Sequence, residues 1–114
     1  MGFKSEYSET ERIQESNKII LKHHTRVPII VEKQDNCILK DINKKKYLVP
    51  RDMNVSQFIF VIRKRIKIEP AQSLFVMIDG ELSPSNVSIG EIYDNRADKD
   101  GFLYMIYTSE NTFG

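Results

Sequence analysis

The chain has 114 residues, 40% of them hydrophobic and 29% charged, a composition typical of one soluble globular domain. Its 17 basic and 16 acidic side chains nearly cancel, which argues against the overall basicity of a nucleic-acid-binding protein. No apolar run is long enough to span a bilayer, and the first 12 residues lack the apolar core of a signal peptide. The single cysteine, Cys37, excludes an internal disulfide framework and favours a reducing compartment, so we expect a cytoplasmic protein.

The first predicted element is a helix over residues 9–24. Ser8 and Glu11 have the spacing of a capping box, and Pro28 ends the helical segment shortly after. Residues 27–33 then read as a strand with two partly apolar faces, one formed by Val27, Ile29 and Val31 and the other by Pro28, Ile30 and Glu32. Residues 34–43 are expected to form a polar loop.

A short second strand is predicted over residues 44–50, "KKKYLVP". Pro50 has no backbone N–H to donate, which suits an edge position. Lys46 and Leu48 share one face of this strand, and Tyr47 and Val49 share the other. Edge strands usually avoid exposed apolar residues, so an apolar pair beside a run of lysines indicates a surface that binds a partner.

The clearest helix is predicted over residues 55–66. Asn54 is a good N-cap, and apolar residues follow at helical spacing: Val55, Phe58, Ile59, Ile62 and Ile66. The helix closes on the basic triplet of residues 63–65, which is typical of a helix C-terminus or of a patch that recognises a partner.

The remaining elements alternate strand, helix and strand. Residues 73–78, "SLFVMI", predict a buried strand followed by a tight turn at Asp79 and Gly80. Ser88 and Glu91 form another capping-box pattern, which predicts a short helix as far as Tyr93. The turn "DKDG" leads into a last strand over residues 102–108. The pattern is α+β around one mixed sheet, in the order of a ubiquitin-like β-grasp.

Residues that could carry catalysis or bind a metal are not grouped in the sequence. His23 and His24 are adjacent, so on a helix they point about 100° apart and do not chelate one ion. Cys37 lies in a polar segment with no cationic cluster near it to depress its pKa. The sequence therefore predicts neither an enzyme nor a cofactor.

Four separated motifs, "KKKYLVP", "QF" followed by "VIRKRI", "DKDGFLY" and "SENTFG", resemble the autophagy-related ubiquitin-like modifiers, the family of the GABA-receptor-associated protein and the microtubule-associated light chains. The likeness runs from Phe3 to Gly114. It implies a ubiquitin-like β-grasp with two additional N-terminal helices, the first near residues 3–7. The implied division is a helical extension at 1–24, a core at 25–108 and a conjugation tail at 109–114.

In this family the C-terminal glycine, here Gly114, is joined to the amino group of phosphatidylethanolamine. The resemblance therefore implies an E1-like activating enzyme, an E2-like conjugating enzyme and a cysteine protease for processing and deconjugation. Phe75 and Met77 are expected to contact these enzymes. The implied role is autophagosome formation, with the lipidated form on the autophagosome membrane.

The family also binds peptides that carry an aromatic residue, two spacers and an aliphatic residue, as found in cargo receptors and adaptors. Electrostatic contacts with such peptides are implied for Arg26, Lys44 and Arg65. By motif position the aromatic pocket would be Glu15, Ile19, Pro28, Ile30, Lys46, Leu48 and Phe102. The aliphatic pocket would be Tyr47, Val49, Pro50, Met53, Phe58, Val61 and Ile62.

Several alternatives remain at this stage. From pattern alone, ordinary core is the favoured explanation for Ile30, Leu48, Phe58, Ile62 and Phe102. An unconjugated adaptor in receptor or vesicle trafficking is a second function, and an RNA- or cytoskeleton-binding module is a third.

Four positions depart from the family pattern. Glu9 stands where an aromatic residue is common, and Met77 stands where Phe is common. Ile20 and Leu21 replace polar or charged residues, so either their helix packs differently or an added apolar surface faces a partner.

Overall fold

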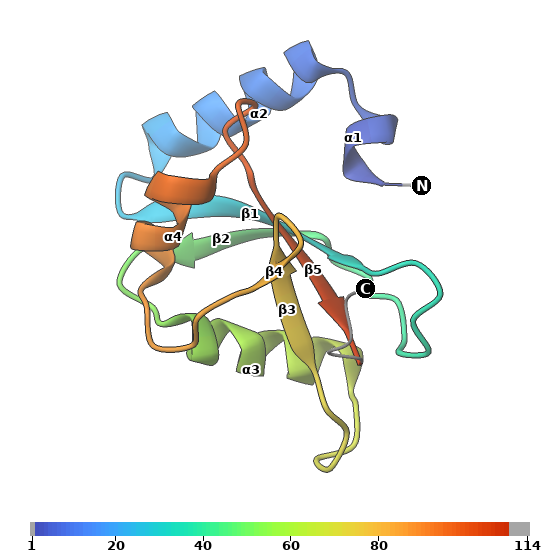
Figure 1. The fold of residues 1–114 in the computed structure, drawn as a ribbon. Coiled ribbons are helices and arrows are strands. Elements are labelled where there is room, and N and C mark those ends of the chain that lie inside the picture. The colour runs from blue at the N-terminus through green and yellow to red at the C-terminus, as the bar shows by residue number, and fades with distance from the viewer. Residues whose placement is uncertain (1, 110–114) are drawn as a thin grey trace.

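The computed structural model describes residues 2–109. None of the helices in this range is both long and apolar enough to cross a membrane. The elements are α1 Phe3–Glu6, α2 Glu9–Lys22, β1 Arg26–Lys33, β2 Lys46–Pro50, α3 Val55–Ile66, β3 Phe75–Ile78, β4 Glu81–Leu82, α4 Ile89–Arg96 and β5 Leu103–Thr108 (Figure 1).

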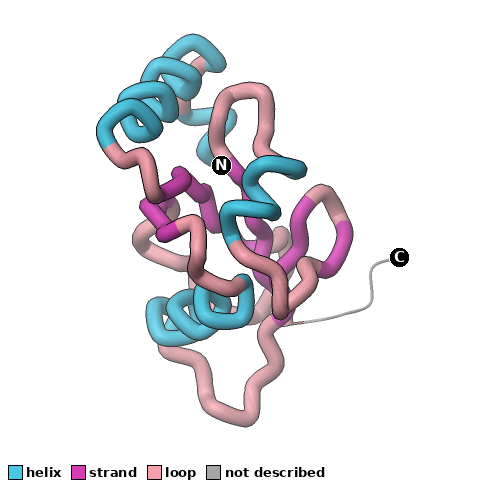
Figure 2. The backbone as a smooth tube through the Cα atoms, turned by 90° about the vertical axis from the view of Figure 1, so that its left-hand side faces the viewer, coloured by secondary structure: helices cyan, strands magenta, loops and turns pink. Residues whose placement is uncertain are grey.

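The strands form one mixed sheet in the order β2-β1-β5-β3-β4. β1 pairs antiparallel with β2 and parallel with β5, and β3 pairs antiparallel with both β5 and β4. α3 crosses one face of the sheet, and α1 and α2 lie over the other (Figure 1). Figure 2 shows α2 and α3 on opposite sides of the strands. This is the β-grasp with two N-terminal helices that the family resemblance implies.

The main core lies between the sheet and α3. Alternation along β1 directs Val27, Ile29 and Val31 toward α3, and all three are buried. The apolar side of α3 meets them through Val55, Phe58, Ile62 and Ile66, which are also buried. The apolar faces that helical and strand periodicity predict for α3 and β1 are therefore confirmed.

A smaller apolar cluster lies on the opposite face of the sheet, under α1 and α2. It consists of Phe3, Ile19, Ile30 and Phe102, with Tyr104 packed against it. The rings of Phe3 and Phe102 meet edge to face with their centroids 5.2 Å apart, a favourable aromatic geometry. Phe3 thereby anchors a helix of only four residues that has no periodicity of its own.

The loop between β1 and β2 corrects one expectation. Residues 34–43 do form a loop, but it is not simply polar, because Leu39 and Ile42 are buried in the main core. The hydroxyl of Tyr107 donates a hydrogen bond to the carbonyl oxygen of Lys40 and holds the loop against β5. The segment also contains Ile38, which is 84% exposed, so the sequence does not show which of its apolar residues are buried.

Two helix ends also differ from the prediction. α2 ends at Lys22 because His23 already leaves helical backbone angles, although its N–H still bonds to the oxygen of Ile19. α4 continues three residues beyond Tyr93, to Arg96. Tertiary ion pairs hold this extra turn, since Asp94 accepts from Arg51, and Arg96 contacts Asp79 and Glu81.

Candidate peptide groove and its surroundings

The candidate site lies along β2, which is an edge strand of the sheet. One side of β2 pairs with β1, with Pro28 opposite Leu48 and Ile30 opposite Lys46. In the sheet of the described residues no strand pairs with its other side. The backbone groups on that side can therefore bond to an added strand.

The seven residues assigned to the aromatic pocket come together where α2 crosses β1 and β2. Ile19, Ile30 and Phe102 belong to the smaller apolar cluster and are buried. Pro28 is buried in β1 opposite Leu48, whose side chain is 37% exposed. The last two residues, Glu15 and Lys46, are charged and join α2 to β2.

An ion pair joins the two charged residues that are assigned to the aromatic pocket. The Nζ atom of Lys46 is 2.8 Å from the Oε1 atom of Glu15. The hydrogen bond from Lys46 lowers the pKa of the Glu15 carboxyl below its ordinary value. Both side chains are about two-fifths exposed, and exposed pairs are weak, so an entering group can displace this one at small cost.

A hollow of about 820 Å³ adjoins this ion pair. One wall is formed by α1 and α2, and the other by residues 43–46 before and at the start of β2. Glu15 and Lys46 line it together with the aromatic side chains of Phe3 and Tyr7. The hollow therefore continues the assigned aromatic pocket toward the N-terminus.

The residues assigned to the aliphatic pocket lie between β2 and α3. The four that are buried in the main core are Tyr47, Val49, Phe58 and Ile62. Pro50, Met53 and Val61 are only partly buried, so they form the accessible rim of this set. The burial of these four residues agrees with the alternative that they are ordinary core residues.

The apolar pair on β2 needs a correction. The sequence suggested that Tyr47 and Leu48 are both exposed, whereas only Leu48 is, because the alternation of the strand turns Tyr47 inward. The ring of Tyr47 packs edge to face on Phe58 with centroids 5.6 Å apart.

The hydroxyl of Tyr47 is buried and has no hydrogen-bond partner within residues 2–109. Burial raises the pKa of this hydroxyl, and the positive charge of Arg65 opposes the shift. A polar atom that is buried without a partner is costly. No pattern in the sequence reveals it.

The three residues assigned to electrostatic contacts are all exposed. Lys44 holds its Nζ atom 5.0 Å above the ring of Tyr47, and Arg65 faces the hydroxyl of the same residue. Arg26 begins β1 opposite Pro50, at the far end of β2. The three cations therefore flank β2 at both ends.

Phe75 and Met77 lie on β3, which β1 and β5 separate from β2. Met77 is opposite Ile106 on β5 and Leu82 on β4, so all three side chains point to one face of the sheet. Met77 itself is only 8% exposed, whereas Leu82 and Ile106 are 50% and 37% exposed and form the accessible part of this face. Sequence reasoning missed Leu82 because β4 has only two residues, and it did not show that Ile106 of the predicted last strand stays exposed beside Met77.

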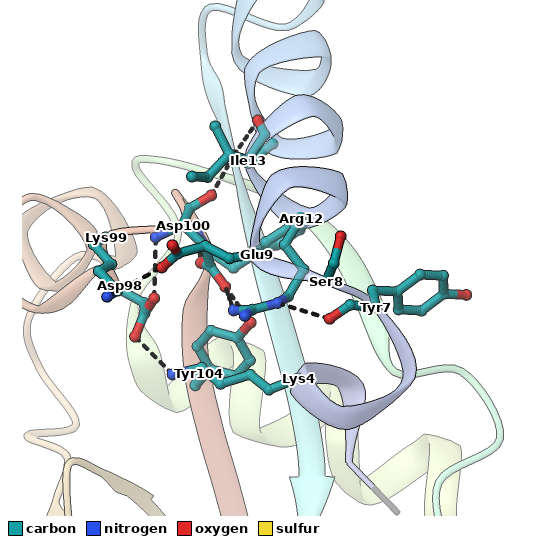
Figure 3. A network of polar contacts seen from close by, with 12 residues as sticks. Lys4, Tyr7, Ser8, Glu9, Arg12, Ile13, Asp98, Lys99, Asp100 and Tyr104 are labelled. Atoms are coloured by element: carbon teal, nitrogen blue, oxygen red, sulfur yellow. Dashed lines mark hydrogen bonds and ion pairs between the residues drawn. The ribbon is translucent and has the colours of Figure 1, made fainter.

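A polar network fixes the position of α2, the wall that carries Glu15 (Figure 3). Asp100 is buried, and its carboxylate accepts hydrogen bonds from Arg12 of α2, the hydroxyl of Tyr104 and the backbone N–H of Phe102. The Oγ atom of Ser16 donates to the carbonyl oxygen of Asp100 over 2.6 Å. The sequence motif "DKDG" predicted only a turn, so the role of Asp100 in holding α2 was missed.

Cys37 and the C-terminal tail complete the candidate residues. Burial raises the pKa of the Cys37 thiol, but hydrogen bonds from Leu39, Ser109 and Thr108 outweigh it and lower the pKa overall. The depression therefore comes from hydrogen bonds and not from charge, which the sequence did not anticipate. Gly114, the expected conjugation residue, lies outside the described residues.

Comparison with known proteins gives consistent results. Residues 11–114 match the family model described as "Autophagy protein Atg8 ubiquitin like". Autophagy-related protein 8B of Oryza sativa is 46% identical over 113 residues, which cover 99% of this chain and 95% of the relative. A solved structure of Trypanosoma brucei ATG8 aligns over 100% of this chain and 98% of its own with a TM-score of 0.92 and 38% identity.

A second solved structure is "Plasmodium falciparum Atg8 in complex with Plasmodium falciparum Atg3 peptide". It has a TM-score of 0.90 and 28% identity, and the alignment covers 96% of this chain and 97% of that one. Fold, length and sequence identity thus agree. The chain belongs to the Atg8 family of ubiquitin-like autophagy proteins.

Proposed function

We propose that this protein is conjugated through Gly114 to phosphatidylethanolamine and that it recruits cargo receptors to autophagosomal membranes through the groove along β2. The observation that carries the recruiting role is the unpaired side of β2. The aromatic pocket residues flank that edge on the α2 side and the aliphatic pocket residues flank it on the α3 side.

A peptide that adds to β2 forms main-chain hydrogen bonds with the free edge, and its alternate side chains enter the two pockets. An aromatic ring displaces the ion pair between Glu15 and Lys46 and packs on Leu48, which is the exposed apolar residue of this set. An aliphatic side chain two spacers later packs against the rim of Met53 and Val61. Arg26, Lys44 and Arg65 attract acidic residues beside the motif and mainly accelerate and orient docking.

Conjugation uses the tail at residues 109–114. An E1-like enzyme activates the Gly114 carboxylate with ATP, and an E2-like enzyme carries it as a thioester. The amine of phosphatidylethanolamine attacks the thioester carbonyl, an amide forms, and the enzyme thiol leaves with the proton. Glycine has no Cβ to obstruct the clefts through which these enzymes reach the carboxylate.

Two features support this assignment. The Plasmodium relative is bound to an Atg3 peptide in its solved structure, which supports contact with an E2-like enzyme here. Two acyl chains also give stable membrane anchoring, whereas one gives marginal binding, so a diacyl lipid suits a chain whose described helices do not span a membrane. A cysteine protease that removes the lipid completes the cycle.

Intact-mass spectrometry tests conjugation directly. The chain is incubated with E1-like and E2-like enzymes, ATP and phosphatidylethanolamine liposomes, with Gly114→Ala as the matched variant. A lipid-sized mass increase in the native chain alone is expected. Absence of that increase, while a homologue is lipidated in the same mixture, refutes conjugation and favours the adaptor function.

Peptide titration tests the groove. Leu48→Ala removes the exposed apolar side chain of β2, and we expect at least a tenfold weaker affinity for an aromatic-x-x-aliphatic peptide. Leu82→Ala is the control, because Leu82 is also an exposed leucine but lies on β4, at the opposite edge of the sheet. Equal losses in the two variants would rule out the groove along β2 as the binding site.

A further inference from the structure

The buried hydroxyl of Tyr47 has no part in the function proposed above. Tyr47 is 7% exposed, and no group within residues 2–109 hydrogen-bonds to its hydroxyl. Almost all buried polar atoms in native proteins have a partner, and a phenylalanine at this position would pack on Phe58 without the cost of an unpartnered oxygen. Packing alone therefore does not account for a tyrosine here.

The charged groups around this hydroxyl are hydrogen-bond donors. The guanidinium of Arg65 faces the hydroxyl, and the Nζ atom of Lys44 is 5.0 Å from the centroid of the Tyr47 ring. Both side chains are exposed, and neither forms an ion pair with another residue of the described range. Arginine and lysine have no acceptor atom, so the proton of the hydroxyl needs an acceptor from a ligand. A negatively charged oxygen suits the hydroxyl and both cations.

The direction of the proposed peptide strand decides which of its residues reaches this place, so the inference rests on the proposed function. The aromatic pocket lies at Lys46 and Leu48. The aliphatic pocket extends past Val49 to Met53, so the motif runs in the same direction as β2. Successive side chains of a strand point to opposite faces of the sheet. The first spacer thus points to the α3 side with the aliphatic residue, and the second spacer points to the α2 side with the aromatic residue.

The arrangement of β2 and α3 brings the first spacer next to Tyr47. The two elements run in roughly opposite directions (Figure 1), so a step back along β2 from Val49 to Tyr47 corresponds to a step forward along α3. On α3 that step leads from Val61 to Arg65, one turn later. Strand residues two apart are separated by about 6.6 Å, and helix residues four apart by about 6 Å. When the aliphatic residue packs on Val61, the first spacer therefore lies beside Tyr47 and Arg65.

We propose that the first spacer of the bound peptide carries an oxyanion, which accepts hydrogen bonds from the Tyr47 hydroxyl and the Arg65 guanidinium. The oxyanion is the carboxylate of an acidic residue or the phosphate of a phosphorylated serine or threonine. Arg65 is exposed, so its side chain turns to admit the anion at little cost. A charged hydrogen bond to a buried hydroxyl is stronger than an exposed ion pair. This contact therefore selects peptides, whereas attraction to Arg26 and Lys44 from outside the motif mainly speeds docking.

Calorimetric titration with synthetic peptides tests the position and the charge. The peptides share one aromatic-x-x-aliphatic sequence and carry glutamate or glutamine at the first spacer, and an isomer with glutamate at the second spacer keeps the same net charge. We expect glutamate at the first spacer to bind about tenfold more tightly than glutamine and more tightly than the isomer. Phosphoserine against serine at the first spacer tests the phosphate in the same way. The proposal is overturned if neither anion binds more tightly than its neutral counterpart, or if an anion at the second spacer gives the same gain.

Variants of the protein test the two donors. Tyr47→Phe removes only the hydroxyl, and Arg65→Gln removes the charge. The measured quantity is the preference for the anion, which is the Kd of the glutamine peptide divided by the Kd of the glutamate peptide. We expect each variant to lower this preference about threefold or more, whereas Tyr107→Phe, which removes another buried hydroxyl, leaves it unchanged. An unchanged preference in Tyr47→Phe overturns the proposal.

Thermal unfolding of the unconjugated chain tests whether the hydroxyl lacks a partner before the peptide binds. Tyr47→Phe is expected to be at least as stable as the native chain, whereas Tyr107→Phe loses the hydrogen bond to Lys40 and is less stable. An equal loss in both variants would show that the Tyr47 hydroxyl has a partner in the free protein, which refutes the proposal. The glutamine peptide separates this site from the groove as a whole. If it binds, the groove stands whatever the spacer shows, and if no peptide binds, the groove and this site are both refuted.

Discussion

The two faces of the sheet are covered in different ways. α3 is attached to its face by a continuous apolar interior that includes Phe58, Ile62 and Leu103. α2 is attached to the other face by a small cluster around Ile19 and by polar contacts that converge on Asp100. Apolar packing is non-directional, whereas the hydrogen bonds of a buried carboxylate need one geometry. The helical layer is therefore fixed precisely but can be released separately from the core.

The largest effect is expected from Asp100→Ala. It leaves Arg12, whose side chain is 11% exposed, without its buried partner, and breaking such a pair costs about 3–5 kcal/mol. Hydrogen exchange should show faster opening of residues 9–22 while β1 and α3 stay protected. Equal loss of protection in α2 and α3 would mean that the two layers are not separable.

Leu103→Ala is the corresponding change in the main core. Leu103 is fully buried on the central strand β5, and truncation of a buried leucine to alanine costs about 2–5 kcal/mol. Urea unfolding should show one cooperative transition at a lower midpoint, with both layers lost together. An intermediate that retains α3 but not the sheet would contradict a single main core.

Gly101→Ala addresses the contact between α2 and the turn before β5. Gly101 has φ +91°, and an added Cβ would collide with the side chain of Ser16. Gly80→Ala is the matched control, because Gly80 has φ +77° and open space around it. Backbone strain alone costs about 1–2 kcal/mol in both variants.

The difference between the free energies of unfolding lost in Gly101→Ala and in Gly80→Ala then measures how tightly α2 packs against the turn. We expect this difference to shrink when Ser16→Gly is added, since that change removes the colliding atoms. Equal free energies of unfolding for the two alanine variants would show that α2 shifts away from the added Cβ without loss of stability.

Alkaline titration gives the smallest effect and compares one tyrosine from each face. Burial raises the pKa of Tyr107 to about 12 on the core side. Burial and the hydrogen bond to Asp100 raise the pKa of Tyr104 on the helical side. Ionisation is thus disfavoured in the folded state, so stability is unaffected below pH 10 and falls as the pH rises through the folded pKa values.

Tyr107→Phe should remove part of this alkaline loss, with a cost of about 1 kcal/mol at neutral pH for the missing hydrogen bond to Lys40. Ultraviolet titration of tyrosinate absorbance alongside thermal unfolding measures both quantities. A native titration with all tyrosines ionising together near pH 10 would contradict the raised values.

Much of the candidate site was predictable from the chain because it depends on local periods. Strand alternation in residues 27–33 and 46–50, and helical spacing in residues 55–66, give the main core and the edge strand without any tertiary information. The residues assigned to the two pockets came from the family resemblance, and the structure brings each set into one region. Their role in binding peptides stays a prediction.

Apart from α1, which only the family resemblance implied, and β4, which was missed, the sequence by itself determined the order of the elements, the caps of α2 and α3 and the face of each predicted strand. These features follow from residues close together in the chain. Only the tertiary structure decided that the buried hydroxyl of Tyr47 has no partner within residues 2–109, that Leu39 and Ile42 pack into the core, and that Asp100 holds α2. The physical reason is that each of these depends on a partner far away in the chain. Arg12 and Asp100, for example, are 88 residues apart and meet only once the sheet has formed.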